Sequence, residues 1–528
     1  MIRLLPKQHE IIRRIGIAGG LALLAYIVYR TFAVPLGHDQ ASYLFEAQRF
    51  LSGAQPYGPR LSETNPPLII WFSALPLMLA SWFHVSAVFL FRAIVMAMLA
   101  ASIAWIIRLL RCASTIAPPG IALFAFATLA AYFGTGLHAF GQREQLLIIL
   151  ILPYVLAAAT GAINRLSVAE RYALGIAAGL AIWFKPHDIA ILIALEIFLA
   201  LRHRTLRRLL SAEFFALLLT SLVILSFVVL FTPLYFKQTP ILVDVYWALG
   251  TNTTFGLALS LYGYMALVAL LLLACYLLRR SLRDTQTTLA LLICSIAASF
   301  AYDLQHTDWP YHAYPHRALF LLAGAYLAVD LADPYFRRSE TGTNRITPFV
   351  LAALAFVIVL IPGVVTHPQF VGYVSKKTPI DPLVGYFAQY QSPTTVYVFS
   401  TSVPALSDAY LQGLNWGSRF AHMWMMPAII QNEMGRSSLP TPFKQLSPER
   451  TAQLAALQRS QSTEDLNYWR PSIVLVQRCT QEKPCQGLEG KNFDMIAWLQ
   501  QSADFAAAWS HYQRQPAIDE YDVYKLAP

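Results

Sequence analysis

Residues 212–231 read AEFFALLLTSLVILSFVVLF, a run in which only the glutamate is charged. A helix needs about 20 apolar residues to cross the roughly 30 Å hydrocarbon core of a bilayer. Similar runs recur along most of the 528-residue chain, which is 56% hydrophobic and only 13% charged. Soluble globular domains average about 25% charged residues. The sequence therefore excludes a string of soluble domains and predicts a polytopic helical membrane protein.

The net charge of +10 is confined to the apolar part of the chain. Residues 366–528 contain 13 basic and 13 acidic side chains, so the whole excess lies in residues 1–365. A basic protein can be a nucleic-acid binder. Here the basic residues flank hydrophobic runs, where Lys and Arg mark the cytoplasmic side of a membrane. The charge pattern thus indicates membrane orientation, with no nucleic-acid partner.

Basic clusters such as Arg13/Arg14 and Arg207/Arg208 set the predicted topology. If all of them face the cytoplasm, an even number of spans must separate successive clusters. Pro66–Phe83 is apolar but carries three prolines, which break or kink helices, and we expect interfacial or re-entrant structure on the outer face. The first outer loop would then cover residues 34–85. The predicted spans number about eleven, at roughly 15–33, 86–107, 118–135, 146–161, 172–185, 188–201, 212–231, 257–278, 287–303, 318–332 and 347–365.

The residues after Val365 differ in composition from the apolar runs before them and predict a small α/β domain over 366–528. Thr395–Ser400, Ile473–Gln477 and Tyr521–Lys525 have the β-branched and aromatic composition of strands. Pro448–Ser460 suits a surface helix with proline in its first turn. An odd number of spans places this domain outside the cytoplasm. The transmembrane module would then be residues 1–365.

Two cysteines of this domain, Cys479 and Cys485, are six residues apart. In an oxidising compartment they can form a disulfide, the alternative being two unpaired thiols. Cys112, Cys275 and Cys294 lie in or near spans and suit packing as small apolar groups.

Ionisable residues gather in four places at the predicted outer face. Charge at a bilayer boundary is costly and is by default a functional candidate. The alternative is that loop charges are solvated or that Arg and Lys side chains snorkel. Because all four groups fall on one side, we expect a shared polar cavity. The groups are His38-Asp39, Arg143-Glu144, Lys185-Pro186-His187-Asp188 and His312 with His316-Arg317.

The first outer loop contains the most specific pattern. It reads Gly37-His38-Asp39-Gln40-Ala41-Ser42-Tyr43, then Glu46-Ala47, Gly53, Pro56-Tyr57 and Asn65-Pro66-Pro67-Leu68. An Asp just after the first span, followed by Tyr, Ala, Gly, Pro-Tyr and an N-P-P-L-like segment, resembles the polyprenyl-phosphate-dependent glycosyltransferases of the GT-C superfamily. The nearest branch is that of protein mannosyltransferases and aminoarabinose transferases. The sequence departs from the pattern in lacking a second acid beside Asp39 and in having Asn65 where some relatives have a basic residue.

The resemblance implies an inverting sugar transfer at the outer face of a bacterial inner membrane. In it a carboxylate assists the attacking hydroxyl and fixed cations stabilise the departing phosphate. Asp39 is the expected general base, and the expected phosphate ligands are Arg143, Lys185, Arg92 and Arg317. The remaining residues expected in the substrate pocket are His38, Tyr43, Glu46, Tyr57, Asn65, Glu144, His187 and His312.

The expected partners are membrane lipids, a polyprenyl-phosphate-linked sugar donor and a glycan, lipid or protein acceptor. No cofactor is indicated. A divalent metal would suit the acidic, histidine-containing mouth, but no ligand spacing assigns one. Two other functions fit charged outer residues: a flippase of lipid-linked sugars, and a non-catalytic assembly subunit. A transporter often has two matching halves, and the sequence shows none.

Overall fold

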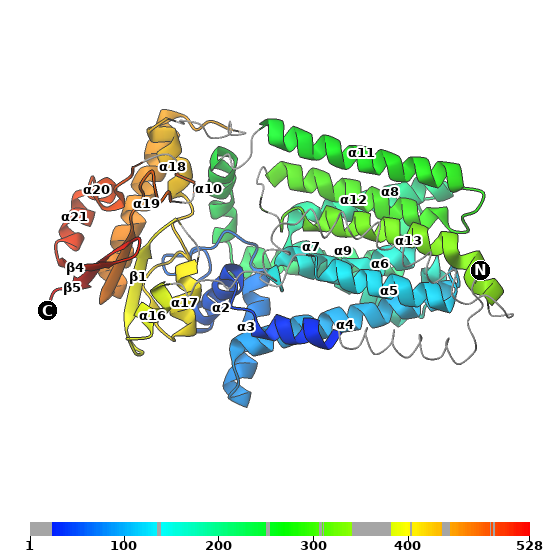
Figure 1. The fold of residues 1–528 in the computed structure, drawn as a ribbon, viewed down its shortest axis with the longest axis horizontal. Coiled ribbons are helices and arrows are strands. Elements are labelled where there is room, and N and C mark those ends of the chain that lie inside the picture. The colour runs from blue at the N-terminus through cyan, green and yellow to red at the C-terminus, as the bar shows by residue number, and fades with distance from the viewer. Residues whose placement is uncertain are drawn as a thin grey trace, which may run out of the picture.

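The computed structural model is an elongated molecule with a helical bundle at one end and an α/β region at the other (Figure 1). It describes residues 24–134, 139–249, 254–305, 309, 311–339, 382–401, 404–435, 444–485, 487, 488 and 492–528. The α2 helix lies where the two parts meet, and α10 stands beside the α/β region (Figure 1). We refer to this end of the bundle as the site end and to the opposite end as the distal end.

Helices occupy every predicted span that falls within the described residues. Residues 24–33 are helical, and the span predicted at 347–365 lies outside the described residues, as does the predicted domain boundary at 365/366. Among the described residues, four helices are long and apolar enough to cross a membrane, namely α4, α9, α12 and α13. The bundle comprises α4 (Ala87–Ala113), α5 (Pro118–Tyr132), α6 (Arg143–Ala159), α7 (Val168–Phe184), α8 (Ile189–His203), α9 (Ala212–Phe231), α11 (Thr254–Leu278), α12 (Thr285–Gln305) and α13 (Tyr314–Ser339).

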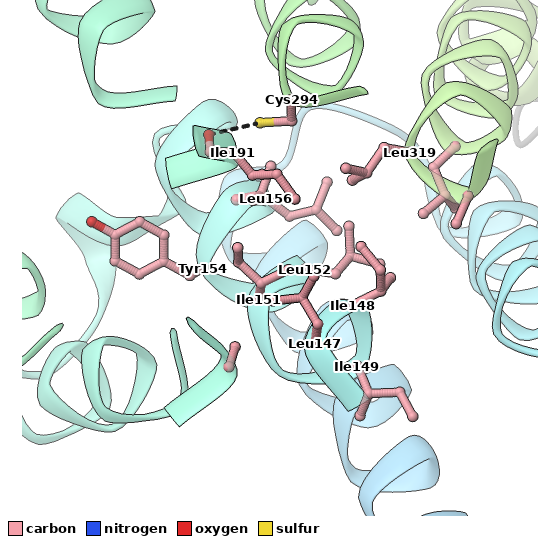
Figure 2. Packing of buried hydrophobic residues seen from close by; sticks show 14 of the residues in the cluster. Leu147, Ile148, Ile149, Ile151, Leu152, Tyr154, Leu156, Ile191, Cys294 and Leu319 are labelled. Atoms are coloured by element: carbon pink, nitrogen blue, oxygen red, sulfur yellow. Dashed lines mark hydrogen bonds between the residues drawn. The ribbon is translucent and has the colours of Figure 1, made fainter. Parts of the chain in front are cut away.

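The α6 helix is at the centre of the bundle core. Every residue of α6 after Arg143 is buried except Leu150. Figure 2 shows its leucines and isoleucines packed beside Leu319 of α13 and Cys294 of α12, whose thiol points to the Ile191 carbonyl. Being apolar on all sides is typical of a helix surrounded by other helices. This central position also fixes where Arg143 and Glu144, at the start of α6, must lie.

Two glycines allow α7 to approach α9 closely. A Cβ atom at Gly175 would lie 2.1 Å from the Glu213 carbonyl oxygen, and one at Gly179 would lie 2.8 Å from that of Leu217. Any larger residue would push the two helices apart. Close packing here holds the far end of α7, and with it Lys185, in a fixed place.

The predicted outer loops contain helices of their own. The first loop forms α2 (His38–Leu51) and α3 (Leu68–Phe83), and the loop after α9 forms α10 (Leu234–Leu249). Pro66 and Pro67 precede α3, where no hydrogen-bonded amide is required, and Pro76 lies inside it without ending it. The segment expected to be interfacial or re-entrant is thus a continuous helix of 16 residues, shorter than a full bilayer crossing.

The C-terminal α/β region contains a five-stranded sheet in the order β2-β1-β3-β5-β4. Strands β2, β1 and β3 are parallel, whereas β5 runs antiparallel to β3 and to β4. The three predicted strands are confirmed, and β2 and β4 are additional. The strands are β1 (Thr395–Phe399), β2 (Asn415–Trp416), β3 (Ile473–Gln477), β4 (Tyr512–Ile518) and β5 (Tyr521–Leu526).

Six helices accompany the sheet within the described residues. The predicted surface helix is confirmed and continues to Trp469. The disulfide between Cys479 and Cys485 is also confirmed, and Cys112, Cys275 and Cys294 are free. The helices are α16 (Pro382–Phe387), α17 (Pro404–Leu411), α18 (Met426–Glu433), α19 (Pro448–Trp469), α20 (Met495–Leu499) and α21 (Ala503–Trp509).

Candidate active site

The site is built around Asp39, in the first turn of α2. The chain enters this helix through an extended Gly37. Arg92 of α4, which is buried, holds the entering segment in place. Its guanidinium donates to three backbone carbonyls between Phe32 and Pro35, at 2.9 to 3.2 Å, and to Gln40 Oε1 at 3.0 and 3.3 Å. These contacts use all five N–H donors of Arg92.

Asp39 is held as a carboxylate by its neighbours. His38 Nε2 lies 3.3 Å from Asp39 Oδ2, and the Gln142 side-chain amide donates to the same oxygen. The Tyr43 hydroxyl donates to Gln142 Oε1 at 2.9 Å, which fixes the orientation of that amide. Burial alone would raise the pKa of Asp39, but His38, Gln142 and Arg143 outweigh it and lower the pKa to about 2. The carboxylate is therefore ionised at neutral pH.

A buried ion pair lies at the start of α6, next to this group. Lys185 Nζ contacts Glu144 Oε1, and both side chains are buried. His312 Nε2 lies 3.6 Å from the same oxygen. Within the described part of the chain, Glu144 Oε2 and the adjacent Arg143 Nε are buried without a hydrogen-bond partner. Buried polar atoms are nearly always satisfied, so these two mark capacity for a ligand.

His187 and Asp188 extend the same group. Both lie in the short 3-10 turn between α7 and α8 (η3, Pro186–Asp188). His187 Nε2 and Asp188 Oδ2 are buried, again without a hydrogen-bond partner among the described residues. Burial and the charges of Lys185 and Arg143 hold the pKa of His187 well below its usual value. The imidazole is therefore neutral and able to accept a hydrogen bond.

A carboxyl pair lies beside Asp39 in the first outer loop. Burial and the neighbouring Glu63 raise the pKa of Glu46 well above its usual value. Glu46 Oε1 accepts from Ser42 at 2.7 Å, whereas Glu63 Oε1 accepts from the Asn65 amide at 2.6 Å. Through this contact Glu63 shapes the loop that precedes α3. Tyr57 donates to the Asn65 carbonyl from a left-handed backbone with φ of 62°.

The structure brings most of the predicted site residues together, and two of the four predicted cations differ from the rest. Eight of the predicted site residues form one group whose members interact electrostatically: His38, Asp39, Tyr43, Arg143, Glu144, Lys185, His187 and His312. Glu46, Tyr57 and Asn65 border it through the first outer loop. Arg92 differs because its donors are already engaged. Arg317 differs because it is exposed on α13, with Tyr302 and His316 as electrostatic neighbours.

Three contributors were not predicted from the sequence. Gln142 bridges Asp39 and Tyr43. Tyr246 of α10 and His422 of the C-terminal region lie in electrostatic range of Asp39. Gln142 directly precedes the predicted site residue Arg143, and this position could have indicated that it belongs to the site. The other two are remote in sequence and only folding brings them to the site.

Arg49 of α2 connects this site to the α/β region through ring contacts and hydrogen bonds. Its guanidinium lies between the Phe45 ring, at 4.4 Å, and the Trp469 ring, at 4.3 Å. It also donates to the backbone carbonyls of Trp416 and Ser418. The cation thus combines ring stacking with hydrogen bonds to the β2 loop. Residues on both sides of the junction hold α2, and with it Asp39.

No group of three or more His, Cys, Asp and Glu side chains within the described residues is arranged to hold a metal ion.

Two of the solved structures that resemble nearly the whole chain are of one protein. One is ArnT from Cupriavidus metallidurans bound to undecaprenyl phosphate, with 13% sequence identity and a TM-score of 0.50. The other is the same protein in the apo state, with 15% identity and a TM-score of 0.51. Each match covers 96% of this chain and 98% of the ArnT chain. The chain has the fold of ArnT.

This is the fold that the resemblance of the first outer loop to the GT-C superfamily implied. No protein-family model and no curated protein matches the sequence. The likeness is therefore carried by the arrangement of elements, because at 13 to 15% identity few side chains are shared. A shared fold by itself does not define a reaction, so the residues of the site must support one.

Proposed function

We propose that the chain is an integral membrane glycosyltransferase that moves a sugar from a polyprenyl-phosphate donor to an acceptor hydroxyl. The observation that carries this proposal is the ionised Asp39 beside Arg143 and the buried Lys185–Glu144 pair. This arrangement supplies a proton acceptor and cations within one site, as sugar transfer from a lipid phosphate requires. The ArnT structure of the same fold contains undecaprenyl phosphate.

Asp39 acts as the general base in this proposal. The acceptor oxygen attacks the anomeric carbon, and its proton passes to Asp39 Oδ. The bond between the anomeric carbon and the phosphate oxygen breaks, and polyprenyl phosphate leaves with the bonding pair. A single displacement of this kind inverts the anomeric configuration. His38 and Gln142 orient the carboxylate and keep it ionised.

Arg143 and Lys185 receive the phosphate. Arg143 has a buried Nε without a partner among the described residues, and a guanidinium can bind a phosphate through two parallel N–H donors. Lys185 contacts Glu144 through Nζ and retains further N–H donors for a phosphate oxygen. We assign no phosphate contact to Arg92, whose five donors bind backbone and Gln40, or to the exposed Arg317.

The proposal places the reaction at the outer face of a bacterial inner membrane, with the α/β region outside the cytoplasm. Two features support this orientation: the basic clusters of the loops at the distal end, and the disulfide of the C-terminal region. The acceptor is a hydroxyl of a glycan, lipid or protein that reaches the junction of the two parts.

The test is sugar transfer by the purified full chain in detergent. The donors are polyprenyl-phosphate-linked pentose, hexose and amino sugar, each offered with lipid, glycan and peptide acceptors. We expect Asp39→Asn to lower the transfer rate by about 10²- to 10⁴-fold, because the amide cannot accept the proton. Asp504→Asn makes the same chemical change at an exposed position of α21 and should transfer at the wild-type rate.

Equal transfer by Asp39→Asn and the wild type would remove Asp39 from the mechanism. Movement of lipid-linked sugar across reconstituted vesicles, with no transfer to any acceptor, would replace the transferase by a flippase.

A further inference from the structure

Aromatic rings from three distant parts of the chain meet beside the Asp39 group. The Tyr246 ring of α10 lies 5.6 Å from the Trp309 ring, which precedes α13, at an interplanar angle of 78°. The Trp424 ring, from the loop between β2 and α18, lies 6.3 Å from Tyr246. Tyr311 stacks on Trp309 at 5.9 Å. Trp309 and Tyr311 are neighbours in the sequence, and tertiary structure brings Tyr246 and Trp424 to them.

The rings border the reacting groups of the proposed site. Tyr246 and Tyr311 lie in electrostatic range of both Asp39 and Arg143. The Trp424 amide donates to the carbonyl of His422, and His422 itself interacts with Asp39. The cluster therefore lies next to the group that would receive the acceptor proton.

Core packing does not account for the whole cluster. All four rings are half-buried, unlike the fully buried aromatic residues of the bundle and sheet cores. Trp424 packs at the edge of the core of the α/β region. Its Nε1 is nevertheless buried and has no hydrogen-bond acceptor among the described residues. A buried indole N–H normally has a partner, so this one indicates a group that arrives with a ligand.

A membrane-interface belt is the other use for such rings. Belt tryptophans direct their N–H toward the lipid headgroups. Trp424 belongs to the α/β region and packs at the edge of its core, so it does not fit a belt. Aromatic faces with one placed donor suit a ligand that has an apolar face and hydroxyl groups at its edge. A sugar ring has both.

We propose that Tyr246, Trp309 and Trp424 form a platform for a sugar ring, with Trp424 Nε1 donating to one of its oxygens. This inference rests on the proposed function, because it places the ring against Asp39. Either the donor sugar or a sugar of a glycan acceptor can supply the ring. Both present the same chemistry, and the experiment separates them.

The test compares three variants of the full chain in detergent. Trp424→Ala removes the ring, Trp424→Phe keeps an aromatic face without the N–H, and Tyr246→Leu removes the middle ring. Trp82→Phe, at an exposed position of α3, is the matched control. The probes are neryl-phosphate-linked hexose and amino-pentose, with sugar-free neryl phosphate beside them. Binding is measured without acceptor, and the KM values for donor and acceptor are measured separately.

If the platform holds the donor sugar, Trp424→Ala weakens binding of the lipid-linked sugars by at least tenfold and leaves sugar-free neryl phosphate unchanged. Trp424→Phe should weaken it by about two- to tenfold, as the loss of one hydrogen bond predicts. If the platform holds the acceptor sugar, donor binding is unchanged and the KM for a glycan acceptor rises by these factors.

The inference is overturned if the three variants, folded as judged by thermal unfolding, keep donor binding and both KM values within twofold of Trp82→Phe. That result leaves the transferase proposal intact wherever the wild type transfers sugar. Conversely, loss of lipid-linked sugar binding in Trp424→Ala supports the platform even if no acceptor is ever glycosylated, because binding needs no transfer.

Discussion

The two ends of the helical bundle differ in how their buried charges are satisfied. At the distal end, Asp333 accepts from Arg283, from Arg337 and from the Ala117 amide, all between 2.6 and 2.8 Å. Glu196 likewise receives two hydrogen bonds from Arg208. At the site end, buried polar atoms of Arg143, Glu144, His187 and Asp188 have no partner among the described residues. The distal charges hold helices together, whereas in the proposed function the site-end charges bind the ligand.

We therefore expect the buried charges of the distal end to contribute to the stability of the bundle and those of the site end to contribute to its function. An unsatisfied buried donor or acceptor costs about 1–3 kcal/mol. A fold keeps such a cost where binding offsets it. Substitutions at the site end should therefore impair transfer, and substitutions at the distal end should lower stability.

The largest effect should follow from Arg143→Gln at the site end. We expect the transfer kcat/KM to fall by about 10²- to 10³-fold, because a cation facing the departing phosphate is lost. Thermal stability should fall less than on loss of Asp333, because Arg143 Nε has no hydrogen-bond partner among the described residues and only the interactions of the guanidinium with Tyr43 and the neighbouring carboxylates are lost. Arg108→Gln, which breaks the exposed Arg108–Glu170 pair on the distal side, is the matched control. Equal kcat/KM in the two variants would contradict the division.

The opposite result is expected for Asp333→Ala at the distal end. Removal of this buried acceptor leaves the Ala117 amide and two arginines without it and should destabilise the fold by about 2–3 kcal/mol. The measurement is thermal unfolding in detergent, with kcat per folded molecule alongside. A fall in kcat greater than about threefold in the folded fraction would show that the distal end takes part in transfer.

Arg49 tests whether the α/β region positions the site. Arg49→Ala removes the cation between Phe45 and Trp469, and we expect kcat to fall about tenfold as α2 loosens. Arg49→Lys keeps the charge but loses the planar stack, so its kcat should lie between that of the wild type and that of Arg49→Ala. Arg60→Ala, which removes a single stack on Tyr468, is the control. A KM change with unaltered kcat would assign Arg49 to binding instead.

The smallest effect concerns the His38–Asp39 pair and pH. Asp39 has its pKa lowered from 3.8 to about 2, so its stabilisation is present above about pH 4 and is lost as the pH falls toward 2. For His38, burial would lower the pKa, but Asp39 outweighs it and raises the pKa above 6.5. The stabilisation from His38 is complete below about pH 6.5 and is lost as the pH rises through that raised pKa.

The pair therefore contributes most between about pH 4 and 6.5. Because His38 is 41% exposed, solvent screening limits the contribution to less than about 1 kcal/mol. The thermal-unfolding temperature of the wild type minus that of His38→Gln should be larger at pH 5.5 than at pH 9. A difference that grows with pH would reverse the assignment.

Much of the architecture could be predicted from the sequence because it depends on local pattern. Apolar runs marked the bundle helices, β-branched runs marked β1, β3 and β5, and a six-residue spacing allowed the disulfide between Cys479 and Cys485. The helices α2, α3 and α10 were not separated from the loops around them. Prolines obscured α3, and α2 and α10 mix polar and apolar residues, so neither stands out as a hydrophobic run.

The sequence by itself determined that this is a membrane protein with charged residues gathered at one end, because hydropathy and charge are sums over neighbouring residues. The resemblance in the first outer loop made Asp39 the candidate base. Only the tertiary structure decided which side chains surround that carboxylate. Arg92 is consumed by backbone carbonyls and Arg317 is exposed, whereas Gln142, Tyr246 and His422 arrive from other elements. Whether the donors of an arginine are already occupied, and which residues from other elements reach Asp39, depend on the three-dimensional arrangement. The spacing of residues along the chain does not specify either.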